Sequence, residues 1–303
     1  MLLQARKRVL YSYPVLLILM LSKSILHARS NFSPLVRCAS SRVVMIAGGK
    51  GGLGQAFIER FIEQAKGRDE EIDIIATSSQ FSSPSTEDIE SGKLHKLKID
   101  IRDYKTFEEA SEWVNSKFGR LDMLINCIGM LHGKLHDKER MPEKTFLELD
   151  PEWMMENFRV NTLPTAMLAK RFCPMLAEGP SDTLGIFAAL SARIGSIEDN
   201  KLGGWFSYRA SKAALHQYMR TLSIELDRKY KAQEKNNKRK VISACLHPGT
   251  VDTGLSEPFQ KNIDPKKLFT PEYSTNKLLS VLESLTEKQN GRIFDYAGQE
   301  IPA

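Results

Sequence analysis

The stretch VVMIAGGKGGLGQ, residues 43–55, decides the fold of this chain. Its first five residues are apolar and predict a buried strand, five of the next seven are glycines, and helix-like sequence begins at Gln55. Glycines permit positive φ and close approach of the backbone, so N–H groups at a helix N-terminus can face a pyrophosphate. The spacing is G-x-x-x-G-x-G and does not end in the Gly-Lys-Ser/Thr of a triphosphate-binding loop. A dinucleotide-binding loop and a tight structural turn both fit this stretch.

Further apolar runs alternate with helix-like sequence along the rest of the chain. Alternation of this kind predicts one α/β domain over residues 42–303, a doubly wound parallel sheet of the Rossmann type with helices on both faces. Ligands bind such sheets at the carboxyl ends of the strands. The expected strands are 43–47, 72–76, 94–99, 121–126, 184–190, 241–246 and 292–296.

Tyr208 and Lys212 lie four residues apart in the run YRASK. The apolar pattern predicts a helix over 208–225, which places both side chains on one face. A positive charge close to a phenol favours its ionised form and lowers its pKa toward working pH. The pair is therefore a candidate general acid for a carbonyl oxygen.

Taken together, these motifs resemble the short-chain dehydrogenase/reductase family over residues 42–300. Asn126-Cys127-Ile128-Gly129 is similar to the stretch that follows the family's fourth strand, with two of its four positions changed. Asn161 and Ser191 stand where the family keeps a helix asparagine and a catalytic serine. Pro248-Gly249 resembles the loop that receives the nicotinamide carboxamide. Within the family, the runs LDPEWMMENFRVNT and GGWFSYRASKAAL look most like the C-factor-type branch.

The resemblance implies an NAD(P)-dependent oxidoreductase that transfers hydride between nicotinamide and a carbonyl or alcohol substrate. Hydride transfer to a carbonyl carbon leaves negative charge on the oxygen, so the site needs a proton donor and a hydrogen bond there. Tyr208 is expected to act as general acid/base and Ser191 to orient the carbonyl. Lys212 is expected to lower the pKa of Tyr208 and hold the nicotinamide ribose, and Asn161 to position a water that relays protons.

The cofactor is expected to be NADP, with NAD as the alternative. The segment after the second expected strand, residues 76–80, offers hydroxyls and no carboxylate that would repel a 2′-phosphate, while Lys50 supplies a positive charge. Asp100 resembles the family's acidic residue near the adenine ring. The expected cofactor contacts are Gly48, Lys50, Gly52, Leu53, Gly54, Thr77, Ser78, Asp100, Ile101, Asn126, Ile128, Gly129, Tyr208, Lys212, Pro248, Gly249, Val251 and Thr253.

The interval between Ser191 and Tyr208 is longer than is usual in the family and predicts an extended substrate loop over residues 198–205. Four apolar residues are expected to line the pocket, which favours an uncharged or weakly polar carbonyl compound: Leu131, Leu202, Trp205 and Phe206. Cys127 and His247 are expected to be structural. Two alternatives remain open, an epimerase or dehydratase on the same scaffold and a non-catalytic NAD(P)-binding sensor or signalling protein.

Residues 1–41 read as a targeting or transit segment. No acidic residue precedes Glu59, and residues 1–38 carry six Lys or Arg, so without them the formal net charge falls from +6 to zero. A nearly neutral domain does not favour nucleic-acid binding. The apolar core at 14–21 also fits a secretory signal or short anchor but is too short for a stable membrane span. A chloroplast address is favoured, with mitochondrion and endoplasmic reticulum as alternatives.

The four cysteines at positions 38, 127, 173 and 245 are scattered, with no metal-ligand spacing and no small-domain disulfide pattern. A reducing compartment and no metal are therefore expected. Self-association as a homodimer or homotetramer is implied by the family resemblance, through the helices that carry Asn161 and Tyr208. A small-molecule carbonyl or alcohol is the expected partner.

Overall fold

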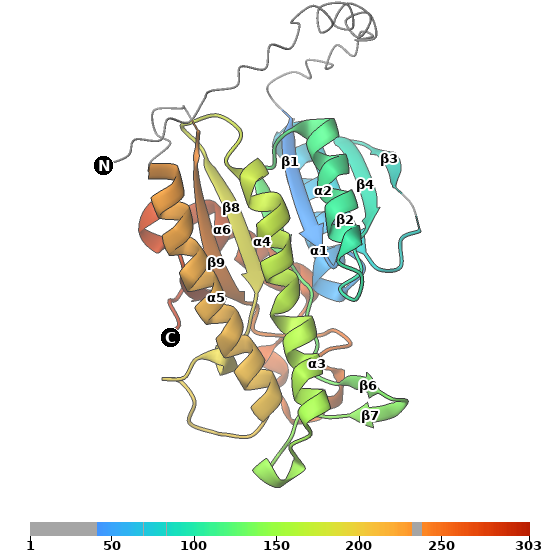
Figure 1. The fold of residues 1–303 in the computed structure, drawn as a ribbon, viewed down its shortest axis with the longest axis vertical. Helices are drawn as coiled ribbons and strands as arrows, with labels where there is room; N and C mark the ends of the chain where they lie inside the picture. Colours follow the sequence, from blue (N-terminus) through green and yellow to red (C-terminus); the bar gives the residue numbers. More distant parts are fainter. Residues whose placement is uncertain (1–40, 69, 83, 232–237) are drawn as a thin grey trace, which may run out of the picture. The chain divides into compact units, whose positions relative to one another are not determined.

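The computed structural model describes residues 41–68, 70–82, 84–231 and 238–303, which build layers of helix on both faces of an eight-stranded sheet (Figure 1). Of the predicted targeting segment, only Ser41 lies within the described residues, and its carbonyl accepts a hydrogen bond from Arg120. The boundary and destination of that segment remain predictions.

The strands pair in the order β12-β9-β8-β5-β1-β2-β4-β3. Every pairing is parallel except that of β3 with β4. Each of the seven predicted strands overlaps one of the parallel strands, so the predicted α/β fold class is confirmed. The bounds are β1 Arg42–Ala47, β2 Ile72–Ser78, β3 Ser85–Ile89, β4 Gly92–Lys98, β5 Met123–Asn126, β8 Leu184–Leu190, β9 Lys240–His247 and β12 Arg292–Asp295.

Strand β3 was not predicted from the sequence. Its residues, STEDI, are mostly exposed and carry no apolar run, because they form a polar edge that only β4 contacts. Charged residues at such an edge discourage pairing with another chain. Two small two-stranded sheets were also not predicted: β6 Gly133–Leu135 with β7 Lys138–Arg140, and β10 Thr250–Val251 with β11 Leu268–Phe269.

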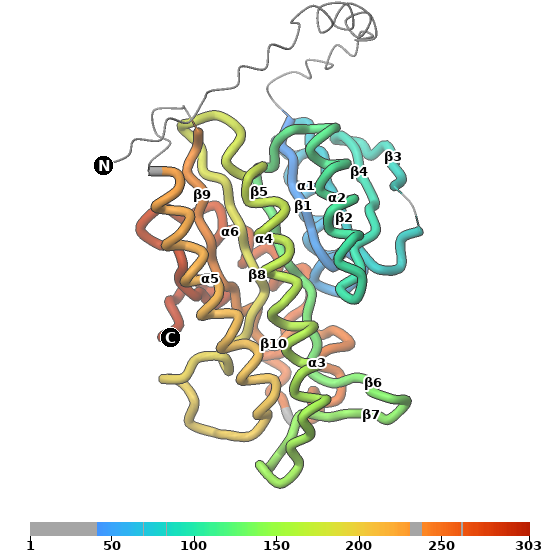
Figure 2. The backbone as a smooth tube through the Cα atoms, in the orientation of Figure 1, coloured from blue at the N-terminus to red at the C-terminus, as the bar shows by residue number. Residues whose placement is uncertain are grey.

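Helices cover the two faces of the sheet separately. In Figure 1, α2, α4 and α5 lie on the near face and α1 and α6 on the far face, and the tube in Figure 2 shows α3 leading directly into α4. Each face has its own apolar core, one around Phe107, Phe172 and Phe187, the other around Phe57 and Phe61. The bounds are α1 Gly52–Arg68, α2 Lys105–Phe118, α3 Pro151–Asn161, α4 Leu163–Leu176, α5 Phe206–Lys231 and α6 Pro271–Ser284.

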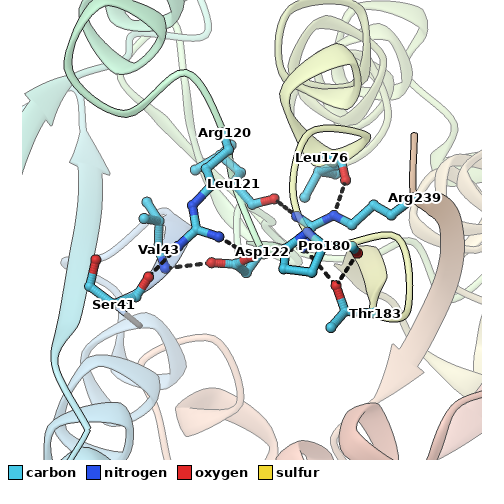
Figure 3. A network of polar contacts seen from close by, with 9 residues as sticks. All are labelled: Ser41, Val43, Arg120, Leu121, Asp122, Leu176, Pro180, Thr183 and Arg239. Atoms are coloured by element: carbon cyan, nitrogen blue, oxygen red, sulfur yellow. Dashed lines mark hydrogen bonds and ion pairs between the residues drawn. The ribbon is translucent and has the colours of Figure 1, made fainter. Parts of the chain in front are cut away.

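The amino ends of the central strands are joined by a buried polar network (Figure 3). Asp122 accepts hydrogen bonds from the Val43 backbone N–H at 2.7 Å and from Arg239 Nη1 at 2.8 Å. Arg239 is 1 % exposed and also donates to the carbonyls of Leu176 and Leu121. A charge buried this deeply is tolerated because every arm of the guanidinium has an acceptor. This end of the sheet is therefore devoted to holding β1, β5 and β9 together.

The opposite end of the sheet carries the predicted site residues. The chain runs outward from β1 through β2 and β4 on one side and through β5, β8 and β9 on the other, so the strand order reverses between β1 and β5. A reversal of this kind leaves a crevice at the carboxyl ends of the strands. Gly48, Cys127, Ser191 and Pro248 each follow one of those ends. In the part of the chain that the structure describes, no helix has the length and apolarity to cross a membrane.

Candidate active site

The glycine turn brings the start of α1 to the crevice. Gly48 has a φ of 81°, and its N–H and that of Gly49 both donate to the Thr77 carbonyl, at 3.1 and 2.9 Å. A Cβ on Gly54 would lie 2.2 Å from the Gly48 carbonyl oxygen, so only glycine lets α1 approach the turn this closely. The helix begins at Gly52, three residues before the predicted start, and the first N–H groups of a helix lack partners within it, which suits binding of a phosphate.

Two cavities lie along the carboxyl edge of the sheet and share Cys127, Ile128 and Gly129 after β5. The first, the β2-side cavity, has a volume of about 240 Å³ and is lined by Gly48, Gly51, Thr77, Ser78, Ser79, Ile99, Ile101 and the three shared residues. The second, the Tyr208 cavity, has a volume of about 230 Å³ and contains Ser191, Tyr208 and Lys212 in its wall. Because they share a wall, the two cavities form a crevice in which an extended ligand can lie.

The β2-side cavity brings together Thr77, Ser78 and Ile101 of the expected cofactor contacts, but neither Lys50 nor Asp100 lines it. Thr77 Oγ1 is buried and has no hydrogen-bond partner among the described residues. Its hydroxyl could accept a hydrogen bond from a ligand hydroxyl or donate one to a phosphate. Lys50 Nζ donates to Gln80 Oε1 at 3.2 Å and lies 5.4 Å from the centre of the Phe81 ring. Asp100 does not line the cavity, and its carboxylate accepts from the Arg102 N–H at 2.9 Å.

The loop after β9 lines the other side of the crevice. Pro248, Gly249, Val251 and Thr253 all contact the Tyr208 cavity, as does Leu53 of α1. Gly52 and Gly54 are not in either wall but fix the turn that these residues face.

Asn126 lines neither cavity. Its Nδ2 donates to Thr165 Oγ1 at 2.8 Å, and its Oδ1 accepts from the Ile128 N–H at 3.0 Å. It therefore shapes the shared wall from behind, by holding the loop after β5 in place.

The Tyr208 and Lys212 side chains differ from the prediction in their electrostatics. Burial raises the pKa of Tyr208, and Lys212 does not lower it. The Lys212 ammonium lies 5.7 Å from the centre of the Tyr208 ring and donates to the Leu190 carbonyl at 3.2 Å, while burial lowers the pKa of Lys212 to about 8. Burial disfavours both charged forms, and this outweighs their mutual attraction. The phenol is therefore protonated at neutral pH.

Ser191 has a partner that the sequence interpretation missed. Its Oγ lies 2.7 Å from His216 Nε2, and its backbone N–H donates to the Leu246 carbonyl at 2.7 Å. His216 lies on α5, four residues after Lys212 and eight after Tyr208. Positions i, i+4 and i+8 share one face of a helix, and this spacing was the available signal.

Asn161 ends α3 beside the other predicted catalytic residues without lining the Tyr208 cavity. Its Oδ1 accepts from the Met130 N–H at 2.8 Å, and its Nδ2 donates to Ser211 Oγ at 3.0 Å. A Cβ on Gly129 would lie 3.4 Å from both Asn161 Oδ1 and Lys212 Nζ. The asparagine therefore lies close to the lysine, and its water-positioning role stays a prediction.

The extended loop contributes one aromatic residue to the cavity. Trp205 has a φ of 53° and packs 5.0 Å from the Phe259 ring and 6.3 Å from the Tyr208 ring, measured between ring centres. Leu131 also lines the cavity, as predicted. Leu202 and Phe206 do not line it: Leu202 is 93 % exposed because the loop turns it to solvent, and Phe206 starts α5 on the outer side.

Glu143 was also missed. It is buried and accepts hydrogen bonds from the Ser207 N–H at 3.1 Å and from Ser207 Oγ, while its own carbonyl accepts from the Trp205 N–H at 2.5 Å. A carboxylate at a helix N-terminus is stabilised by the helix dipole. Glu143 therefore fixes the first turn of the helix that carries Tyr208. Its position in an irregular loop gave no signal in the sequence.

Cys127 and metal binding were the other reactive features to consider at this site. Cys127 lies in the shared wall, but burial raises the pKa of its thiol, which keeps it protonated and a poor nucleophile. Among the residues that the structure describes, no group of three His, Cys, Asp or Glu side chains is placed to hold a metal ion.

The mostly parallel sheet with a crevice at the carboxyl ends of its strands defines a Rossmann-type α/β fold, and comparison with known proteins gives the family. Residues 42–264 match the family profile described as short chain dehydrogenase. The chain belongs to this family.

The chain is similar to bacterial, fungal and vertebrate proteins. C-signal of Myxococcus xanthus is 30 % identical over 186 residues, which are 61 % of this chain and 93 % of that protein, and supports the predicted C-factor-like branch. An uncharacterised oxidoreductase of Schizosaccharomyces pombe is 24 % identical over 277 residues, 87 % of this chain and 98 % of the relative. The crystal structure of NADPH-bound carbonyl reductase from chicken fatty liver superposes with a TM-score of 0.69 at 21 % identity, over 88 % of this chain and 96 % of that one.

Proposed function

We propose that this protein is an NADP-dependent reductase of uncharged or weakly polar carbonyl compounds. One observation carries the proposal: a single cavity is lined by Ser191, Tyr208 and Lys212. This Tyr208 cavity shares a wall with the β2-side cavity beside the glycine turn. The nicotinamide supplies hydride chemistry when it is bound. The glycine cradle at Gly54 and the unpartnered Thr77 hydroxyl fit a dinucleotide in that crevice.

The side chains of the Tyr208 cavity supply the proton and the hydrogen bond that a developing oxyanion needs. Tyr208 is protonated at neutral pH, as an unperturbed phenol also is, so it can donate its proton to the carbonyl oxygen as negative charge develops there. The Ser191 hydroxyl supports the same oxygen. Lys212, buried and with a pKa lowered to about 8, can hold a ribose hydroxyl and replace the proton on Tyr208 through it.

Lys50 supports the preference for NADP. It lies beside Gln80, just after β2, where the adenosine ribose of a dinucleotide is held in this class of fold. Residues 76–80 place no carboxylate there to repel a 2′-phosphate. The chicken carbonyl reductase of similar fold was solved with NADPH.

The wall of the Tyr208 cavity supports an uncharged substrate. Apolar side chains dominate it, among them Leu131, Ile194, Trp205, Leu255 and Phe259, and none of the described Asp, Glu or Arg residues lines it. Lys212 also lines it, and its ammonium donates to the Leu190 carbonyl. A cationic substrate group would lose its hydration here without a carboxylate among the described residues to pair with.

The test is a fluorescence titration of the full chain with NADPH and NADH, beside an assay with an aromatic aldehyde, an aromatic ketone and a quinone. Tight NADPH binding, with turnover that Tyr208→Phe abolishes, supports the proposal. Binding without turnover of any carbonyl would favour a sensing role, and turnover without net oxidation of NADPH would favour an epimerase or dehydratase. No binding of either nucleotide would contradict the assignment of the glycine turn.

A further inference from the structure

His216 makes a hydrogen bond with Ser191, which lines the Tyr208 cavity. The distance from His216 Nε2 to Ser191 Oγ is 2.7 Å, and the two residues are 8 % and 5 % exposed. Ser191 follows β8 and His216 lies in α5, so the hydrogen bond joins the sheet to the helix that also carries Tyr208 and Lys212.

The His216 ring is held in one position by its neighbours. A Cβ on Gly195 would lie 2.8 Å from the His216 Cε1 atom, so the short helical turn Arg193–Gly195 packs directly on the ring. The other edge of the ring borders a separate cavity of about 380 Å³ that contains Gly195, Gln217 and Ile301 in its wall. His216 Nδ1 is buried and has no hydrogen-bond partner among the described residues. The hydrogen bond to Ser191 therefore holds the Nε2 edge of the ring.

The state of His216 decides where the Ser191 proton points. A serine hydroxyl carries one proton, and a neutral imidazole carries a proton on one nitrogen and a lone pair on the other. With the proton on Nδ1, Nε2 would accept the serine proton, and Ser191 would have nothing to donate to a substrate oxygen. With the proton on Nε2, the imidazole donates to Oγ and the serine proton is free for the carbonyl.

The surroundings of His216 keep the ring neutral. Burial lowers the pKa of His216 to about 4, and the positive charge of Lys212 and the nearby His247 act in the same direction, while the Gly195 backbone opposes them. In the proposed reaction Ser191 has to donate its one proton to the substrate oxygen, so the hydrogen bond of 2.7 Å between Oγ and Nε2 has to be donated by the ring, from Nε2–H.

We infer that His216 is a positioning residue which, in its Nε2–H form, donates to Ser191 Oγ and so directs the serine proton toward the substrate carbonyl oxygen. The inference rests on the proposed reductase function, because it assigns a task to Ser191 in that reaction. His216 touches neither the substrate nor the cofactor in this arrangement. Its loss should therefore act on kcat and leave the Kd for NADPH unchanged.

A double-mutant cycle of His216→Leu and Ser191→Ala in the full chain tests the coupling. His216→Leu is expected to lower kcat roughly tenfold, the worth of one neutral hydrogen bond. Ser191→Ala is expected to lower it further, and adding His216→Leu to Ser191→Ala should then cost nothing. Equal costs of His216→Leu with and without Ser191 would overturn the inference, because a purely structural role for His216 would not depend on that hydroxyl.

Two further variants separate donation from packing. His216→Gln keeps an N–H donor at about the same reach and should recover most of the rate that His216→Leu loses, whereas equal rates for the two would contradict a donor role. Gln217→Leu, at the exposed next position of α5, is the matched control and should leave kcat unchanged. Melting temperature and NADPH titration confirm that each variant is folded.

The tautomer itself can be read without turnover. In the protein labelled with ¹⁵N-histidine, the His216 signals, assigned by their absence in His216→Gln, should show a protonated Nε2 and a bare Nδ1 near pH 7. A bare Nε2 would refute the inference whatever the enzyme does. If instead Tyr208→Phe retained full turnover, the proposed function would fail while the tautomer result stood on its own.

Discussion

The side-chain amide of Asn161 makes hydrogen bonds with both the N–H and the carbonyl of Met130. Asn161 Oδ1 accepts from the Met130 N–H at 2.8 Å, and Nδ2 donates to the Met130 carbonyl at 3.1 Å. Nδ2 also reaches Ser211 Oγ at 3.0 Å. One amide therefore ties the end of α3 to the loop after β5 and to α5, the helix of Tyr208.

Asn161→Ala should lower the free energy of unfolding by about 2–3 kcal/mol, because it leaves two backbone groups of Met130 without partners in a buried setting. Turnover should fall as well, since the loop beside Gly129 and Lys212 loses its anchor. Urea denaturation and the carbonyl reductase assay measure the two effects. A loss of turnover at unchanged stability would instead favour the predicted water-positioning role alone.

Gly54→Ala should abolish NADPH binding or prevent folding. Its Cβ would lie 2.2 Å from the Gly48 carbonyl oxygen, so the turn and the start of α1 must separate. The matched control is Gly67→Ala in the same helix, where a Cβ meets nothing within 4 Å. That variant should be more stable by up to about 1 kcal/mol, because alanine favours helix. Thermal melts and NADPH titration measure the stability and the cofactor affinity of both variants. Normal NADPH binding by Gly54→Ala would show that the turn does not require glycine at position 54.

Lys212→Met should stabilise the free protein while it abolishes turnover. Burial lowers the pKa of Lys212 from 10.5 to about 8, and each pH unit of displacement corresponds to about 1.4 kcal/mol, so the variant should gain on the order of 3 kcal/mol at pH 7. Between pH 8 and 10.5 the unfolded chain binds the proton that the folded chain has released, so the wild type recovers stability as the pH rises. The difference in the free energy of unfolding between Lys212→Met and the wild type should therefore fall to about 1 kcal/mol at pH 10.

Urea denaturation of both proteins at pH 7 and pH 10 checks this trend. A Lys212→Met variant that is less stable than the wild type at pH 7 would mean that the hydrogen bond to the Leu190 carbonyl outweighs the cost of burial.

Arg239→Met should cost about 1–3 kcal/mol of stability, because it removes the ion pair with the partly buried Asp122 carboxylate, which keeps the Val43 N–H and Arg120 as partners. Arg292→Met, which breaks an exposed ion pair with Glu300, should cost less than about 1 kcal/mol. Turnover per folded molecule should be the same in both, since the network lies at the end of the strands opposite the crevice (Figure 3). A lower kcat in folded Arg239→Met would show that the two ends of the sheet are coupled.

Lys50→Gln should raise the Kd for NADPH roughly tenfold and leave the Kd for NADH nearly unchanged, because the lysine charge is expected to face the 2′-phosphate in water. The effect should weaken as salt is added. Titrations with both nucleotides at low and high ionic strength measure it. An equal loss of affinity for both nucleotides would place Lys50 at the pyrophosphate instead.

The sequence by itself determined the parallel strands and the glycine turn. Strands buried on both faces must be apolar throughout, and a helix start packed on a turn requires glycine, so both leave a local record such as residues 43–47 and Gly54. Helical spacing likewise placed Tyr208 and Lys212 on one face of α5.

Tertiary structure decided what depends on neighbours far apart in the chain. The edge strand β3 exists only through its pairing with β4, and its polar residues carry no apolar period. Helical spacing put His216 on the face of α5 that carries Tyr208 and Lys212, but only tertiary packing brings it to Ser191, 25 positions earlier in the chain. The pKa of Tyr208 rises although Lys212 stands one helical turn away, because burial by surrounding elements, and not spacing along the helix, sets the cost of a charge.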